Sequence, residues 1–133
     1  MKTLIEVKLN DVINGVESMK YLMDISLPAK TAYKVAKLAQ GMENELKLFS
    51  DAREKLVRKY ANKDENNELI VDENNQITVA QDNIETYQKE LSELLDTEVK
   101  FEVSKISIDE LTNDISPNKI INLMPFIEEN PPV

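Results

Sequence analysis

An apolar stripe with helical spacing runs from Leu27 to Tyr60, and it constrains the fold more than any other feature of the sequence. Pro28 suits the first turn of such a helix, because the N–H that proline lacks would have no helical partner there. At 1.5 Å per residue the helix is about 50 Å long, which exceeds the usual helix length in a small domain. We therefore expect it to pack along a second helix or a second subunit, with Gly41 as either a weak point or a close packing contact. The stripe consists of Val35, Leu38, Met42, Leu46, Phe49, Ala52, Leu56 and Tyr60.

A second, shorter stripe predicts another helix between residues 80 and 95. Its apolar positions again share one helical face. Thr78 and Gln81 have the spacing of a capping box at the start of this helix. The stripe consists of Ala80, Ile84, Tyr87, Leu91, Leu94 and Leu95.

The segment between the two stripes predicts a β-hairpin. Residues 69–71 and 77–79 are short β-rich runs, and they flank the pair Asn74-Asn75. Asparagine tolerates the positive φ that tight hairpin turns require. The two helices would then form an antiparallel pair with this β-hairpin at its tip.

Two other segments alternate apolar and charged residues, as half-buried strands do. Residues 4–9 place every second side chain on an apolar face, and residues 98–108 do the same as far as Ser104-Lys105. There the phase slips by one residue, which is what a β-bulge produces. We expect the two strands to pair antiparallel and to close the base of the helical pair.

Short helices are expected near both ends of the chain. Asn10 or Asp11 can cap the first of them, although Gly15 weakens it. Ser116-Pro117 can begin the last, which Pro125 interrupts. The first has apolar residues at helical spacing: Val12, Val16, Met19 and Met23.

Together these elements predict a single α+β domain over residues 1–127. It is a long antiparallel helical hairpin with a β-hairpin at its tip and a small antiparallel sheet at its base. Residues 128–133, which end in Asn-Pro-Pro-Val, are expected to form a flexible tail. We identify no internal repeat and no linker that divides domains.

The composition restricts the chemistry that the chain can perform. The 133 residues include no His and no Cys, which excludes imidazole bases, Ser-His triads, thiol nucleophiles and most zinc sites. Gly15 and Gly41 stand alone, so there is no glycine-rich phosphate loop. We predict that the chain is not an enzyme and uses no cofactor. No apolar run reaches the length of about 18 residues that a membrane span needs, and charge begins too early for a secretory signal. A cytoplasmic location is the default.

The net charge of −9 is unevenly distributed along the sequence. Residues 1–61 carry 11 basic and 8 acidic side chains, whereas residues 62–133 carry 5 and 17. The acidic half disfavours direct nucleic-acid binding, because it repels phosphate. It is compatible with a basic partner, with imitation of phosphate charge, or with solubility alone.

The acidic segment from Asn62 to Glu73 has the length of a twelve-residue calcium loop. Asn62 rather than Asp stands first, Asn67 stands where the turn needs Gly, and Ile70 occupies the ninth place. We therefore interpret the segment as a solvated acidic turn and predict no metal there. Its carboxylates are the candidate partner-binding residues: Asp64, Glu65, Glu68, Asp72 and Glu73.

Two further charged groups have alternative interpretations. Lys30, Lys34 and Lys37 recur at helical spacing. They either match the acidic residues 93–98 within the helical pair or form a phosphate-binding patch. An acidic face on the second helix is interpreted as solvated rather than catalytic, because its neighbours are polar. That face consists of Glu85, Glu90, Glu93 and Asp96.

The two apolar stripes most simply form one shared core. Where one stripe is wider than its partner can cover, the remainder would be a seam between copies of the chain. The candidate seam residues are Leu46, Phe49, Leu56 and Tyr60. We therefore expect a homo-oligomer.

Several segments of the sequence carry a family resemblance. They are Ala32 to Leu38, Thr97 to Val103, Ile108 to Leu111, Ser116-Pro117 and Pro125 to Ile127. Together they resemble a family of short uncharacterised proteins encoded by phages and prophages of Gram-positive bacteria, over residues 28–127. The resemblance implies a phage context and location in the host cell, but it assigns no catalytic residue.

These observations predict a non-catalytic, phage-encoded acidic module that binds a host or phage protein and modulates or inhibits it. Two alternatives stay open. The acidic half is also compatible with a decoy that imitates nucleic acid in the groove of a host protein. The chain is otherwise a virion or assembly component.

Overall fold

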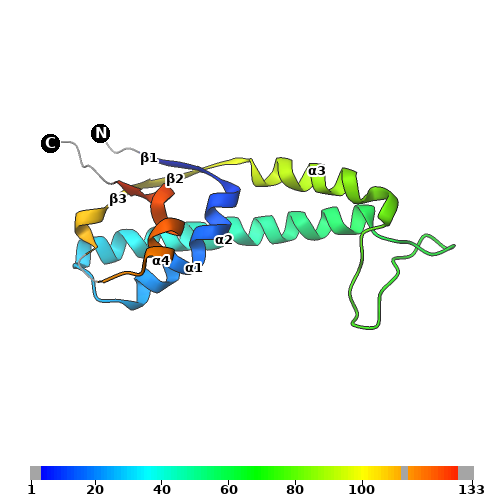
Figure 1. Ribbon diagram of the computed structural model, residues 1–133, viewed down its shortest axis with the longest axis horizontal. Coiled ribbons are helices and arrows are strands. Elements are labelled where there is room, and N and C mark those ends of the chain that lie inside the picture. Colours follow the sequence, from blue (N-terminus) through cyan, green and yellow to red (C-terminus); the bar gives the residue numbers. More distant parts are fainter. Residues whose placement is uncertain (1–3, 112–113, 129–133) are drawn as a thin grey trace. The chain divides into compact units, whose positions relative to one another are not determined.

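The computed structural model describes residues 4–111 and 114–128. This part of the chain is α+β and mainly helical, with four α-helices and a small antiparallel sheet, so the predicted fold class is confirmed at that level (Figure 1). Residues 129–133 of the predicted tail lie outside the described part. The elements in order are β1 (Leu4–Lys8), α1 (Leu9–Asp24), α2 (Ala29–Tyr60), a 3-10 turn (Gln81–Asn83), α3 (Ile84–Leu95), β2 (Glu98–Ser104), β3 (Ile106–Ser107), a 3-10 turn (Ile108–Glu110), α4 (Pro117–Leu123), a 3-10 turn (Met124–Phe126) and β4 (Ile127–Glu128).

The chain groups into two compact units, which we describe separately. Unit 1 comprises residues 1–46 and 97–133, and unit 2 comprises residues 47–96. The long helix predicted from the apolar stripe is present as α2, and its residues belong in part to each unit. The extent of a single domain over residues 1–127 stays a prediction.

In unit 1, β1 and β2 form the expected antiparallel pair (Figure 1). Ile5 lies opposite Phe101 and Val7 opposite Val99, and all four side chains are buried. The register then shifts, because Leu4 pairs with Ser104 and residues 102–103 of β2 are skipped. The predicted irregularity is therefore present slightly earlier than expected. After Lys105 the chain enters β3, which pairs in parallel with β4, a pairing too short to be predicted from the sequence.

The first helix differs from its prediction at both ends. Lys8 rather than Asn10 or Asp11 precedes α1, and the Asp11 carboxylate accepts a hydrogen bond of 3.1 Å from the Lys8 backbone N–H. Met23 is 51% exposed, and Leu22 is the buried residue instead. Leu22 and Met23 follow Met19 by three and four residues, so both border the same buried stripe, and the packing of unit 1 covers Leu22.

Helix α4 begins after Ser116 as predicted and packs against α1 (Figure 1). Gly15 makes this approach possible, since an added Cβ would lie 2.8 Å from Cε2 of Phe126 and 2.9 Å from the Asn122 carbonyl oxygen. The ring of Phe126 in turn lies 6.4 Å from the ring of Phe101, measured between centroids. Gly15, which weakened the helix prediction, is therefore a packing contact.

Unit 2 contains the last turns of α2, a loop of two tight turns, and α3. The loop leaves and rejoins the helices through an antiparallel bridge between Ala61 and Val79, and the Ala80 N–H donates to the Tyr60 carbonyl at 2.8 Å. The predicted capping box is wrong, because a 3-10 turn precedes α3 and Ala80 lies before that turn without a side-chain cap.

The hydrophobic core lies in unit 1. Among the hydrophobic residues that are buried in the described part of the chain, only Ala61 belongs to unit 2. The apolar stripe of α3 is present, but α3 has no buried residue. Unit 2 therefore has much less buried apolar surface to stabilise it than unit 1 has.

Candidate functional site

The acidic loop of unit 2 consists of two turns with the same geometry. Asp64 Oδ1 accepts hydrogen bonds from the backbone N–H groups of Asn66 and Glu68, at 2.9 and 3.0 Å. Asp72 Oδ1 accepts the equivalent bonds from Asn74 and Gln76, both at 2.9 Å. Each turn is closed by an antiparallel bridge, and each carries an asparagine with φ of 63°, Asn67 and Asn75. We call residues 64–68 and 72–76 the tandem acidic turns.

The two turns arise from an internal repeat, so the expectation of no repeat is wrong. Residues 64–71 read Asp-Glu-Asn-Asn-Glu-Leu-Ile-Val, and residues 72–79 read Asp-Glu-Asn-Asn-Gln-Ile-Thr-Val. The repeat is readable in the sequence, although the predicted hairpin turn lies only in the second copy. The expected turn at Asn74-Asn75 is found, and a copy of it precedes it.

The five predicted partner-binding carboxylates are all exposed and lie on these turns. Asp64 and Asp72 are engaged by their own turns, whereas the side chains of Glu65, Glu68 and Glu73 make no contact with other described residues that would hold them. Across residues 4–111 and 114–128, no three acidic side chains converge closely enough to hold a metal ion. The turns present negative charge at the surface of unit 2.

The charge asymmetry of the sequence takes a different form in the folded units. Unit 1 carries 9 basic and 13 acidic residues, and unit 2 carries 7 and 12, so their net charges are −4 and −5. The strongly acidic half of the sequence is thus divided between both units. The acidity is concentrated locally instead, since residues 62–79 carry five carboxylates and one lysine.

The four predicted seam residues lie along α2, but they do not form one open face. Leu46, Phe49, Leu56 and Tyr60 are each half-buried, and Leu46 belongs to unit 1 while the other three belong to unit 2. Within unit 2, Lys59 precedes Tyr60, and its Nζ forms an ion pair with Oε1 of Glu90 on α3 at 3.5 Å. Their role as a seam between copies stays a prediction.

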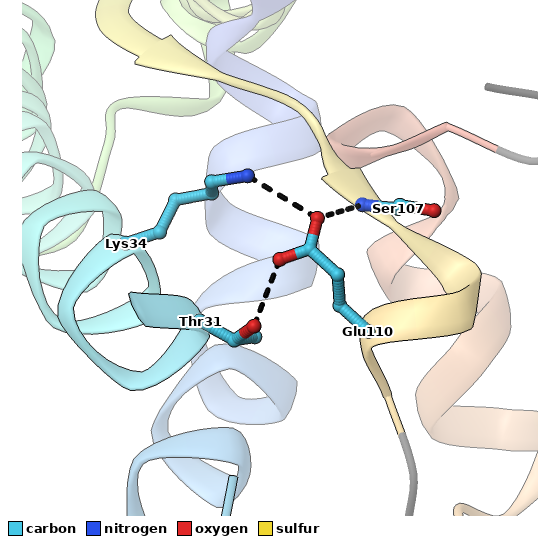
Figure 2. A network of polar contacts seen from close by, with 4 residues as sticks. All are labelled: Thr31, Lys34, Ser107 and Glu110. Atoms are coloured by element: carbon cyan, nitrogen blue, oxygen red, sulfur yellow. Dashed lines mark hydrogen bonds and ion pairs between the residues drawn. The ribbon is translucent and has the colours of Figure 1, made fainter. Parts of the chain in front are cut away.

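Lys34 of the predicted lysine group takes part in a polar network in unit 1 (Figure 2). Its Nζ lies 3.3 Å from Oε1 of Glu110, while the Thr31 hydroxyl donates to Oε2 of the same carboxylate at 2.8 Å. The backbone N–H of Ser107 donates to Oε1 at 3.2 Å. The sequence analysis did not single out Glu110, because 76 residues separate it from Lys34 and no local pattern marks it.

The environment of Glu110 keeps its carboxylate ionised. Burial by itself would raise the pKa of Glu110, but the hydrogen bonds from Thr31 and Ser107 and the charge of Lys34 together outweigh burial and lower this pKa below its ordinary value. A carboxylate held in its charged form is a poor general acid at neutral pH. The network therefore joins α2 to the 3-10 turn at residues 108–110.

The same lysines line a groove between α2 and β2, entirely within unit 1. It has a volume of about 400 Å³ and is lined by Lys30, Tyr33, Lys34, Lys37, Glu102, Val103 and Ser104. A neighbouring hollow of about 350 Å³ shares Tyr33 and Lys37 with it and continues along α2 past Ala36 to Gln40. Tyr33 is 71% exposed. We call the first of these hollows the basic groove.

Comparisons of the chain with protein-family models, with curated proteins and with solved structures find no match. Among the described residues, none of the helices combines the length and the apolar character that crossing a membrane requires. The tandem acidic turns and the basic groove are therefore the two surfaces that bear on function.

Proposed function

We propose that the chain is a non-catalytic, phage-encoded interaction module whose tandem acidic turns bind a basic surface on a host or phage protein and so modulate or inhibit it. The observation that carries this proposal is the composition of the turns. Five exposed carboxylates surround Ile70 and Val71, which are 47% and 45% exposed. Exposed apolar side chains bordered by charge are typical of surfaces that a partner covers.

In this proposal, α2 and α3 form an antiparallel helical hairpin that carries the turns at its tip. Support comes from contacts within unit 2. The Tyr60 carbonyl accepts hydrogen bonds from the Ala80 N–H at 2.8 Å and from Nδ2 of Asn83 at 3.4 Å. The ion pair between Lys59 and Glu90 joins the same two helices further along.

The affinity of such a surface has to come from more than charge. Each exposed ion pair contributes about 0.2–1 kcal/mol, and salt screens it. Ile70 and Val71 add apolar area that leaves water on binding, at roughly 25 cal/mol per Å². We therefore expect rapid, salt-sensitive association with a partner that offers basic side chains around an apolar contact.

The same turns favour one alternative, a nucleic-acid-mimicking decoy. The two turns repeat an Asp-Glu pair at an interval of eight residues, as phosphates are repeated along a nucleic-acid backbone. A decoy predicts that DNA competes with the chain for the captured protein and that the competition disappears at high salt. If the partner does not bind nucleic acid, added DNA should leave the amount of captured protein unchanged.

The test compares three immobilised proteins in a bacterial lysate: wild type, Glu65→Gln/Glu73→Gln, and Asp51→Asn/Glu85→Gln. Both double variants remove two exposed carboxylates from unit 2, but only the first removes them from the tandem acidic turns. We expect wild type and the control to retain the same partner, identified by mass spectrometry, and the turn variant to retain at least fivefold less. Equal retention by all three proteins would contradict the proposal. The phage origin is tested separately by the neighbouring genes.

A further inference from the structure

The basic groove of unit 1 contains positive charge that the described part of the chain leaves unpaired. Lys34 is engaged by Glu110, but within the described part of the chain neither Lys30 nor Lys37 forms an ion pair. Lys30 lies in the first turn of α2, where the helix dipole favours anions, and no acidic residue occupies that turn. The position of Lys30 costs some helix stability in the free protein, and an anionic occupant would relieve that cost.

The groove also has an apolar component between these charges. The exposed ring of Tyr33 lies one residue before Lys34 on α2, and Val103 is half-buried on the β2 side. The single acidic side chain that lines the groove among the described residues is Glu102. An occupant that fits this surface has acidic groups on both sides of an apolar segment.

We propose that the basic groove binds the tandem acidic turns of a second copy of this chain. In those turns, Glu68 and Asp72 flank Leu69, Ile70 and Val71, so the order is acidic, apolar, acidic. Residues 68–72 span about 13 Å in extended conformation, at roughly 3.3 Å per residue. Lys30 and Lys37 are seven residues apart on a helix and are therefore about 10.5 Å apart along its axis. The groove and the segment 68–72 both place an apolar part between two charged ends. Their charges are opposite in sign, and their lengths are approximately equal.

This inference rests on the proposed function, because it assigns an occupant to the same acidic turns. The contact joins two different surfaces, the groove in unit 1 of one copy and the turns in unit 2 of another. Such a contact closes into a two-fold dimer where it forms reciprocally, and otherwise continues into rings or open chains. A different protein with basic side chains would compete with the second copy for the tandem acidic turns.

Sedimentation velocity over a range of protein concentrations tests the proposal with complementary charge reversals. One variant is Lys30→Glu/Lys37→Glu, which reverses the groove, and the other is Glu68→Lys/Glu73→Lys, which reverses an exposed carboxylate on each side of residues 69–71. These side chains are exposed and unengaged among the described residues, so circular dichroism should match wild type. The control is Lys47→Glu/Lys55→Glu, which makes the same charge change as the groove variant on exposed positions of α2 in unit 2.

Wild type and control should self-associate, and the association should weaken several-fold between 50 and 500 mM salt, values chosen to span roughly 14 to 4 Å of Debye screening length. Each reversal variant alone should associate at least tenfold more weakly. An equimolar mixture of the two variants should regain association, because the native turns of one meet the native groove of the other and the two reversed surfaces are again opposite in charge.

Three results would overturn the inference: wild type that stays monomeric at millimolar concentration, groove and turn variants that associate like wild type, or a mixture that does not recover association. Self-association that resists both reversals but is lost in Phe49→Glu would assign the interface to the predicted seam instead. If Glu65→Gln/Glu73→Gln loses its lysate partner while the groove reversal leaves self-association intact, the proposed function stands and this inference fails.

Discussion

Gly41 lies against the ring of Phe101, where an added Cβ would be 3.0 Å from the ring atom Cδ1. The contact brings α2 close to the buried face of β2. Gly15 makes the corresponding contact with Phe126, and the two rings pack against each other with their planes tilted by 60°. Two glycines in helices thus accommodate the aromatic pair at the centre of unit 1.

Alanine substitution should lower the free energy of unfolding more at Gly15 than at Gly41. Gly15→Ala should lower the free energy of unfolding by about 1–3 kcal/mol, because the added methyl group meets a backbone carbonyl that cannot easily move. Gly41→Ala should cost less, since the Phe101 ring can shift slightly and alanine favours helix over glycine by about 1 kcal/mol. Urea denaturation of both variants measures the difference. A Gly15→Ala protein as stable as wild type would contradict the packing described for α1 and α4.

Glu110 should make stability depend on pH in a defined direction. Because its pKa is lowered in the folded protein, the stabilisation is fully present above the pKa of the unfolded chain, about 4.3, and is lost as pH falls through the folded value. At neutral pH, Glu110→Gln should cost about 0.5–1 kcal/mol, a range kept small because the Glu110 side chain is 30% exposed and screened by solvent. Urea denaturation at pH 7, 5 and 3 should show this difference shrinking toward zero. Asp109→Asn, at an exposed neighbouring position, serves as the control and should show little difference at any of these pH values.

The two acidic turns should respond to mutation independently. Asp64→Ala removes the acceptor for the amides of Asn66 and Glu68, so these two amides should exchange faster with solvent deuterium. Asp64→Asn keeps an acceptor oxygen and should preserve most of the protection. Hydrogen exchange followed by NMR should show the amides of Asn74 and Gln76 unchanged in both variants. Faster exchange in both turns would mean that they form one cooperative unit.

The asparagines with positive φ provide a second test of the turns. Asn67→Ala or Asn75→Ala should each destabilise its turn by about 1 kcal/mol, because the left-handed region is unfavourable for a side chain with a Cβ and no local hydrogen bond. Glycine at the same positions should be tolerated or slightly stabilising. Amide exchange within each turn measures the effect. Equal behaviour of alanine and glycine would exclude the described backbone.

The location of the core predicts very different costs for two leucines of α2. Leu38 is fully buried in unit 1, so Leu38→Ala should cost about 2–5 kcal/mol. Leu56 is half-buried in unit 2, so Leu56→Ala should cost about 1 kcal/mol or less at low protein concentration. Thermal unfolding of both variants compares them. A Leu56→Ala protein as unstable as Leu38→Ala would show that unit 2 has a core of its own.

Local elements were predictable because their signals are local. The apolar spacing around Val35 and Leu38 predicts α2, the alternation at Ile5 and Val7 predicts β1, and Ser116-Pro117 predicts the start of α4. The pairing of β1 with β2 was also predicted, since both are short amphipathic strands in need of a partner. The error at the capping box concerns where a helix begins, which local signals define poorly. At Met23 the spacing allowed either of two neighbouring residues to be buried, and only the packing decides between them.

The candidate sites were predictable only in part. The carboxylates from Asp64 to Glu73 are visible in the sequence, and the repeated octapeptide that shapes them into two equal turns was readable there as well. The basic groove was not, because the wall opposite Lys30 and Lys37 is supplied by residues 102–104, far along the chain. Glu110 is another such case, since its role depends on Thr31 and Lys34.

By itself, the sequence determined the residue types and the local periodicities: which segments form helices and strands, and which kinds of chemistry the absence of His and Cys excludes. Only the tertiary structure decided which charges are neutralised. Charge along a chain sums without regard to distance, whereas electrostatic interactions fall off within about 8–10 Å at physiological salt. Lys34 and Glu110 therefore cancel across 76 positions, while Lys30, Lys37 and the tandem acidic turns keep charge that is free to meet a partner.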